Sequence, residues 1–301
     1  MLSRKNKLIL LKLLSLFSVV RGYNILVIVI AQYLTSIFIL APHVPISHIL
    51  FDTKLFVLIL ASSIVIASGY IINNFYDREK DLINRPQKSM LDRLVSQRTK
   101  LTGYFVLNFL SVVLASYVSF RAVLFFSIYI FGIWIYSHKL KKIPLFGNII
   151  AALLSIIPFF AVFVYYKNFD HVIFVHASYL FLLLVIREMV KDLSTIKGDL
   201  AQDYHTLPIL YGEKVSKRVI TILVLACILP TYLLLTQYDI GYMGIYFNIV
   251  LSLLFFFLVG LWLSKAQKHY LWLHNAMKFI IVSGVFNIVL IDIEVILRKF
   301  L

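Results

Sequence analysis

The sequence predicts an all-α membrane protein, a polytopic bundle of nine transmembrane helices. The chain of 301 residues is 61% hydrophobic and only 14% charged, with a mean hydropathy of +0.91. Soluble domains contain about 45–50% apolar and about 25% charged residues. Apolar segments of roughly 20 residues recur, and each is long enough to cross the hydrocarbon core as a helix. These segments do not alternate polar and apolar residues as transmembrane strands do, so a barrel is excluded.

The apolar segments divide the chain into nine predicted spans. They cover about residues 22–41, 55–76, 102–120, 121–137, 146–166, 172–190, 217–236, 242–263 and 275–297. The third and fourth spans are separated only by a tight turn near residues 119–121. No connection has room for a soluble domain, so we expect residues 1–301 to form a single transmembrane domain.

The first 20 residues are predicted to form an amphipathic helix that lies in the membrane interface and leads into the first span. Their basic start and apolar continuation resemble a signal peptide. However, Lys12 interrupts the apolar run and no small-x-small cleavage site follows. We therefore expect this segment to be retained.

The basic residues are distributed unevenly between the two ends of the predicted helices. With the N-terminus inside, 24 of the 29 Lys and Arg residues lie on one side, and the exceptions are Lys54, Arg121, Lys167, Arg298 and Lys299. Short cytoplasmic loops carry this excess. The net charge of +15 therefore indicates topology and contact with anionic membrane lipids rather than binding of nucleic acid. We expect the inner membrane of the cell as the location.

Nine of the 14 acidic residues lie in two segments on that same side, 77–92 and 188–213. Each segment directly follows an apolar span. In the first, Asn73, Asp77 and Asp81 are spaced i, i+4, i+8 and share one helical face. In the second, positions 188, 192, 195 and 199 form a similar stripe. Both stripes should therefore face the cytoplasm.

Closely spaced carboxylates beside a bilayer repel each other and need a cation to offset them. Oxygen ligands without nearby His or Cys suit Mg²⁺, which also takes phosphate oxygens. The alternative interpretation is that the two clusters are helix ends carrying solvated charges. Two metal-binding patches at the mouth of an apolar bundle are typical of a site for a diphosphate that is joined to a long hydrocarbon.

The residues of both clusters resemble the two motifs of the UbiA family of intramembrane prenyltransferases. The first motif is the run Asn73-Asn74-x-x-Asp77-x-x-x-Asp81 followed by Asn84-Arg85-Pro86, in which Asn74 stands where the family usually has Asp. The second is the run Arg187-Glu188-x-x-Lys191-Asp192-x-x-Thr195-x-x-Gly198-Asp199. This second run is most similar to the branch that contains digeranylgeranylglyceryl phosphate synthases and chlorophyll synthase-like enzymes. That branch usually has a carboxylate at the position of Thr195 and Gly at the position of Asp203.

The resemblance implies a role for each matching residue. Metal binding is implied for Asn73, Asp77, Asp81, Asp192, Asp199 and Asp203, which would hold two Mg²⁺ ions that bridge the diphosphate. Catalytic contact with the diphosphate or the reacting carbon is implied for Arg85, Tyr136, Lys141, Arg187 and Lys191. Substrate binding is implied for Arg21, Asn24 and Asn148. Tyr70 and Tyr129 join Tyr136 as candidates for shielding a carbocation with a ring face.

The resemblance also implies Mg²⁺-dependent transfer of a prenyl group from an isoprenoid diphosphate to a lipophilic acceptor. We expect geranylgeranyl transfer to geranylgeranylglyceryl phosphate, as in ether-lipid synthesis. The alternative acceptor is a quinone precursor of the hydroxybenzoate or dihydroxynaphthoate type. A transporter or lipid flippase would place its acids at mid-membrane and show related halves, and an alcohol phosphatidyltransferase would need an Asp-Gly-x-x-Ala-Arg run, which this chain lacks. Nothing in the sequence specifies an oligomeric state.

Overall fold

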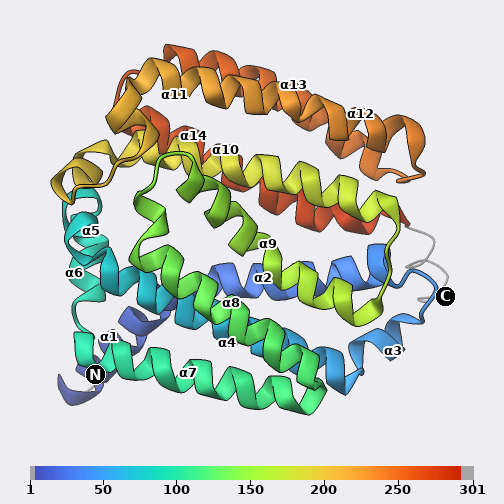
Figure 1. The fold of residues 1–301 in the computed structure, drawn as a ribbon, viewed down its shortest axis with the longest axis horizontal. Coiled ribbons are helices and arrows are strands. Elements are labelled where there is room, and N and C mark those ends of the chain that lie inside the picture. The colour runs from blue at the N-terminus through green and yellow to red at the C-terminus, as the bar shows by residue number, and fades with distance from the viewer. Residues whose placement is uncertain (1–3, 293–301) are drawn as a thin grey trace.

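The computed structural model describes residues 4–292, and every regular element within that range is a helix. The elements are α1 (Arg4–Val20), α2 (Gly22–Thr35), η1 (Ser36–Leu40), α3 (Ile46–Leu50), α4 (Thr53–Tyr76), α5 (Arg78–Asn84), α6 (Pro86–Asp92), α7 (Gln97–Val118), α8 (Phe120–His138), η2 (Leu140–Lys142), α9 (Phe146–Tyr166), α10 (His171–Ala201), α11 (Leu207–Ala226), α12 (Ile228–Gln237), α13 (Met243–Leu263), α14 (Gln267–Asn287) and η3 (Ile288–Ile291). Figure 1 shows the long helices running side by side, with α5 and α6 at one end of the bundle and α3 at the other.

Nine helical segments of the described chain are long and apolar enough to cross a membrane, so the predicted fold class is confirmed and the chain is an integral membrane protein. Most predicted boundaries agree within a few residues. The last span begins at Gln267, eight residues before the predicted start at 275, and the predicted end at 297 lies outside the described residues. Arg298 and Lys299 lie outside them as well.

Two spans are longer than their apolar runs. The predicted span 172–190 continues as α10 to Ala201, because charged side chains pair within the helix; Lys191, for example, contacts Glu188 at 2.7 Å. The predicted span 217–236 begins at Leu207, and its first turns are set off by a break at Gly212, where φ is 81°. A prediction from hydropathy alone ends a helix where the charged residues begin, although the helical backbone continues.

Side-chain caps set the start of two spans. The Asp52 carboxylate accepts hydrogen bonds from the backbone of Lys54 and Leu55, and α4 begins there. Ser119 lies between α7 and α8 and caps α8 through the backbone N–H of Ala122. The predicted tight turn at 119–121 is this cap.

α10 runs through the middle of the bundle and packs against α9, α11 and α14 (Figure 1). α4 packs against α7 and α8 on the other side of the bundle. α1 contacts α4 and α6 at the end where α5 and α6 lie. Both acidic motifs therefore lie at one end of the bundle.

Candidate active site

The first motif spans the junction between α4 and α5. Asp77 has φ −87° and ψ 6°, so α4 ends before it, yet the i→i+4 hydrogen bonds continue from Asp77 N–H to the Asn73 carbonyl and from Asp81 N–H to the Asp77 carbonyl. The helical register therefore carries across the bend, as the spacing predicts. The side chains of Asn73 and Asp77 lie together at this bend.

One lysine and one tyrosine hold the first motif. The Lys141 ammonium donates to Asn73 Oδ1 at 3.2 Å and to Asp77 Oδ1 at 2.7 Å. The Tyr204 hydroxyl donates to the same Asp77 oxygen at 2.8 Å. Burial raises the pKa of Asp77, but the charges of Lys141 and Lys80 and these two hydrogen bonds outweigh it and bring the pKa to about 2. Asp77 is therefore an anion at neutral pH.

The second motif forms a buried stripe along α10. Thr195 donates from its hydroxyl to Asp199 Oδ2 at 2.8 Å, and Asn148 on α9 donates to Asp192 Oδ2 at 2.7 Å. Glu188 is held by Arg187 and Lys191, each at 2.7 Å. Asp199 is fully buried. The stripe that the sequence predicts thus exists on a single helix.

α5 and α10 touch directly, which brings the two motifs together. A Cβ at Gly198 would overlap the Asn84 amide and lie 2.9 Å from the backbone oxygen of Lys80, so only glycine permits this approach. The Asn84 side chain bonds the backbone of α10 twice: its amide nitrogen donates to the Thr195 carbonyl at 3.3 Å, and its amide oxygen accepts from the Gly198 N–H at 3.2 Å. Lys80 on α5 forms an ion pair with Asp199 on α10.

The short helix η2 delivers Lys141 to the site. Gly147, at the start of α9, allows η2 to pack closely, since a Cβ there would lie 2.9 Å from the Leu140 carbonyl oxygen. Lys141 consequently points inward, whereas Lys139 is exposed. The backbone N–H of His205 donates to the Lys142 carbonyl at 3.1 Å and places Tyr204 beside η2.

Two connected cavities lie between the motifs. A polar pocket of about 30 Å³ is lined by Asn73, Asp77, Lys80, Tyr136, Lys141, Gly147, Asn148, Glu188, Lys191, Asp192, Tyr204 and Thr206. An active-site cavity of about 430 Å³ extends from it into the bundle. Asn73, Tyr136, Glu188 and Lys191 line both. A ligand with a charged head and an apolar tail can therefore lie across the two.

The wall of the active-site cavity away from the carboxylates is basic. It includes Arg21, Arg85, Lys88 and Lys278, whereas Arg187, which lines the same cavity, is paired with Glu188. The Arg21 guanidinium lies 5.0 Å from the Tyr70 ring, and Asn24 bonds the Tyr70 hydroxyl at 3.3 Å. This wall can bind an anion separate from one in the polar pocket.

Aromatic rings line the interior of the same cavity. Tyr70, Tyr129 and Tyr136 all belong to its wall. The Tyr129 hydroxyl replaces a missing backbone hydrogen bond in α9. Pro158 has no N–H to donate to the Leu154 carbonyl, and the Tyr129 hydroxyl donates to that oxygen at 3.0 Å. The three candidate rings for cation shielding thus surround one space.

Four predicted or motif residues line neither cavity. Asp199 is fully buried, where it pairs with Lys80 and accepts from Thr195. Asp203 is in a left-handed turn with φ 53°; its side chain is 90% exposed and lies 3.7 Å from His205, and it lines neither cavity. Asp81 lines neither cavity, and burial together with the charge of Asp77 raises its pKa. Asn74 points away from the site and bonds Asp92 and Lys100.

Several residues of the site were not among the predicted site residues. Lys80, Glu188 and Tyr204 line the polar pocket, and Lys278 lines the basic wall. The spacing of Lys80 and Glu188 within the motifs could have indicated them. No local pattern marks Tyr204, because its contact with Asp77 joins residues 127 positions apart.

The oxygen donors of the site suit Mg²⁺. Within residues 4–292, no three His, Cys, Asp or Glu side chains converge on one point, and lysine ammonium groups neutralise the carboxylates instead. Asn73 and Asp77 offer hard oxygen ligands on one side of the polar pocket, and Asp192 offers them on the other. The donor set therefore fits this ion.

Comparison with known proteins identifies the family. The sequence profile of the UbiA prenyltransferase family matches residues 10–281. The chain belongs to the UbiA prenyltransferase family. The resemblance predicted from the two motifs is confirmed.

Other members of the UbiA family resemble the chain along much of its length. A digeranylgeranylglyceryl phosphate synthase of Methanobrevibacter smithii is 28% identical over 237 residues, 75% of this chain and 80% of the relative. One of Thermococcus gammatolerans is 31% identical over 185 residues, 60% of this chain and 66% of the relative.

Solved structures of UbiA proteins share the fold. One of a digeranylgeranylglyceryl phosphate synthase superposes with a TM-score of 0.70 at 23% identity and covers 93% of this chain and 98% of the other. A UbiA homologue from Archaeoglobus fulgidus bound to GPP and Mg²⁺ gives 0.67 at 14% identity and covers 91% and 99%.

Proposed function

We propose that this UbiA protein transfers a geranylgeranyl group from geranylgeranyl diphosphate to geranylgeranylglyceryl phosphate, with two Mg²⁺ ions bridging the donor diphosphate. The observation that carries the proposal is the division of one continuous site into a polar pocket with carboxylates and a basic wall without them. A diphosphate with its metals suits the first, and an acceptor phosphate suits the second. The relatives named for this reaction support it.

The donor diphosphate would lie in the polar pocket. One ion would be held by Asn73 and Asp77 and the other by Asp192, which all line the polar pocket. Asp81 and Asp199 line neither cavity and would join the two ions only by turning toward the pocket. Lys80 and Lys141 pair with Asp199 and Asp77 and line the polar pocket, where their ammonium groups would contact the diphosphate oxygens. When bound, Mg²⁺ neutralises the charge that develops on the leaving diphosphate.

Transfer breaks the bond between C1 of the prenyl group and the diphosphate oxygen, which leaves with the electron pair. Lys141 and Lys191 line the polar pocket and Arg187 lines the active-site cavity, so all three could stabilise the departing charge, and Tyr136, which lines both cavities, would lie beside C1. The rings of Tyr70 and Tyr129 shield the carbocation and exclude water. The acceptor hydroxyl oxygen then bonds C1 and gives its proton to the departing diphosphate.

The basic wall supports a phosphate-bearing acceptor. Arg21, Lys88 and Lys278 come from three different segments and line one side of the cavity. Lys278 lies over the Tyr23 ring at 4.3 Å, which keeps its ammonium at the cavity mouth. A phosphate carries more negative charge than the single carboxylate of a hydroxybenzoate and would use more of these donors.

We propose that the site opens to the cytoplasm of a cell whose inner membrane holds the protein. The basic bias of the loops supports this orientation, since α5, whose Lys80 lines the polar pocket, lies at the end of the bundle where most Lys and Arg residues are found. Soluble donor and Mg²⁺ would enter at that end.

Turnover against a panel of acceptors tests the proposal. Purified protein in nanodiscs receives Mg²⁺, geranylgeranyl diphosphate and one of geranylgeranylglyceryl phosphate, 4-hydroxybenzoate or dihydroxynaphthoate, and products are weighed by mass spectrometry. We expect product only with the glycerol phosphate ether. Lys278→Ala should raise the KM for this acceptor without changing that for the donor, and Lys268→Ala, at an exposed lysine in the first turn of the same helix, is the matched control. Product with an aromatic acceptor alone would overturn the acceptor assignment.

A further inference from the structure

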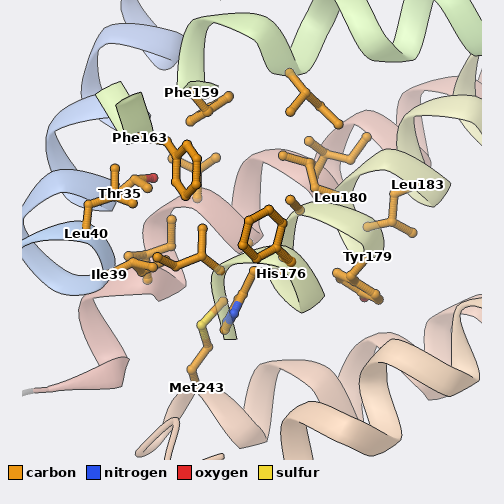
Figure 2. A pocket seen from close by; sticks show the side chains of 18 of the residues that line it. Thr35, Ile39, Leu40, Phe159, Phe163, His176, Tyr179, Leu180, Leu183 and Met243 are labelled. Atoms are coloured by element: carbon orange, nitrogen blue, oxygen red, sulfur yellow. The ribbon is translucent and has the colours of Figure 1, made fainter. Parts of the chain in front are cut away.

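A third cavity, the far chamber, lies among η1, α9, α10 and α13. It has a volume of about 130 Å³ and is lined almost entirely by apolar side chains. Figure 2 shows Ile39, Phe163, His176 and Leu180 around this space, contributed by η1, α9 and α10. None of the roles proposed above uses it.

The far chamber continues the same helix faces that line the active-site cavity. On α14, Asn275 and Lys278 line the active-site cavity, and Ile281 and Val285, three and seven residues after Lys278, line the far chamber. On α2, Ile28 lines the first and Thr35 the second. Residues at such spacings stack on one side of a helix, so the two cavities lie end to end.

A polar barrier formed by one buried side chain, Gln32, lies between the residues that line the two cavities. Gln32 lies between Ile28 and Thr35 on the same face of α2 and is fully buried. Its amide nitrogen donates to the Pro158 carbonyl at 2.8 Å and to Ser62 Oγ at 3.3 Å, and so bridges three helices. Pro158 lines the active-site cavity, and its neighbour Phe159 lines the far chamber.

The hydrogen-bonding groups of the Gln32 side chain are only partly satisfied. The amide oxygen of Gln32 is buried and accepts no hydrogen bond from the described residues. An unpaired buried acceptor destabilises the fold, so packing alone does not account for a glutamine here. A partly bonded amide can also turn aside at lower cost than a fully bonded one.

The length of the combined path matches a long isoprenoid. His176, in the far chamber, precedes Lys191, in the polar pocket, by 15 positions on α10, which is about 22 Å at the rise of a helix. That span is of the order of an extended geranylgeranyl chain and clearly exceeds a geranyl chain. We infer that the far chamber receives the terminal isoprene units of the donor, with Gln32 as the gate, and that it selects long donors.

The inference rests on the proposed prenyl transfer, and filling the far chamber tests it. Ala177 lines the chamber, so Ala177→Phe should block the end of a long chain and leave room for a short one. We expect kcat/KM to fall by about tenfold or more for geranylgeranyl diphosphate and by less than about twofold for geranyl diphosphate. Ala226→Phe, at an exposed alanine of α11, is the matched control.

Photolabelling provides a readout that does not need turnover. A geranylgeranyl diphosphate analogue with a diazirine on its terminal unit should label Met243 and Leu180 of the far chamber in the wild type. An equal loss with both donors in Ala177→Phe, or labelling confined to Tyr23 and Leu271 at the cavity mouth, would overturn the inference and indicate that the chain leaves sideways into the membrane. A wild type that turns over no donor would instead overturn the proposed function.

Discussion

Replacement of Lys141 by Met should separate the stability of the metal-free site from its affinity for metal. Lys141 contacts Asp77 at 2.7 Å, and the two side chains are 6% and 12% exposed. Removal of the ammonium leaves a buried carboxylate without its main partner.

The cost can be worked from the pKa of Asp77. Its shift from 3.8 to about 2 corresponds to about 2 kcal/mol of stabilisation at neutral pH, since one pKa unit is about 1.4 kcal/mol. Breaking a buried ion pair costs about 3–5 kcal/mol in general. We therefore expect Lys141→Met to lose about 2–4 kcal/mol of stability.

The sign of the pH dependence follows from the lowered pKa. Stability from the ionised Asp77 is fully present above its unfolded pKa of 3.8 and is lost as the pH falls toward about 2. The difference between wild type and Lys141→Met should therefore be largest at neutral pH and shrink below pH 4.

Thermal unfolding in nanodiscs at pH 7, with EDTA or with Mg²⁺, measures both effects. In EDTA the variant should unfold several degrees below the wild type. Mg²⁺ should raise its unfolding temperature more than that of the wild type, because the ion no longer competes with an ammonium for Asn73 and Asp77. Lys139→Met, at an exposed lysine two residues earlier, should behave like the wild type. An equal response to Mg²⁺ in Lys141→Met and wild type would refute the reasoning.

Three further predictions concern the surroundings of the site. Asn74→Asp should lose about 1–3 kcal/mol of stability, because a carboxylate cannot donate the 3.0 Å hydrogen bond that Asn74 gives Asp92. Gln87→Glu, at an exposed position of α6, should leave stability unchanged, and equal unfolding temperatures of the two variants would contradict the prediction. Asp203→Gly should leave the Mg²⁺ titration of activity unchanged, because the carboxylate is 90% exposed, and should not lower stability, because glycine accepts a φ of 53°; a higher Mg²⁺ requirement would return Asp203 to the metal site. In a Cys227→Ser background, Glu79→Cys and Asp203→Cys should react with a membrane-impermeant maleimide from one face and Lys167→Cys from the other, and labelling of positions 79 and 203 from opposite faces would exclude a shared site.

The sequence predicts the fold well because membrane spans are local. An apolar run of about 20 residues specifies a helix without knowledge of its neighbours, and nine such runs specify the bundle. The end of a helix is harder to predict where an apolar run is followed by charged residues. α10, for example, extends 11 residues past its predicted end at 190. Its charges pair along the helix, which hydropathy does not register.

The site is predictable only in part for the same reason. Helical spacing places Asp192 and Asp199 on one stripe and Asn73 beside Asp77, and the structure has both arrangements. The partners that complete the site come from distant segments. Lys141 and Tyr204 both bond Asp77, and they lie 64 and 127 positions from it in the sequence. Asp203 shows the reverse, since proximity in sequence to α10 does not bring it into the pocket.

The central claim is that carboxylates from α4–α5 and from α10 each hold a metal ion against one diphosphate. Electron paramagnetic resonance can count bound Mn²⁺, as a substitute for Mg²⁺, in nanodisc samples saturated with geranylgeranyl thiodiphosphate. We predict two ions per wild-type chain and one in each of Asp77→Asn and Asp192→Asn, with both variants still folded by circular dichroism. An unchanged count in either variant, or a wild type that binds no Mn²⁺ in the presence of the analogue, would contradict the account.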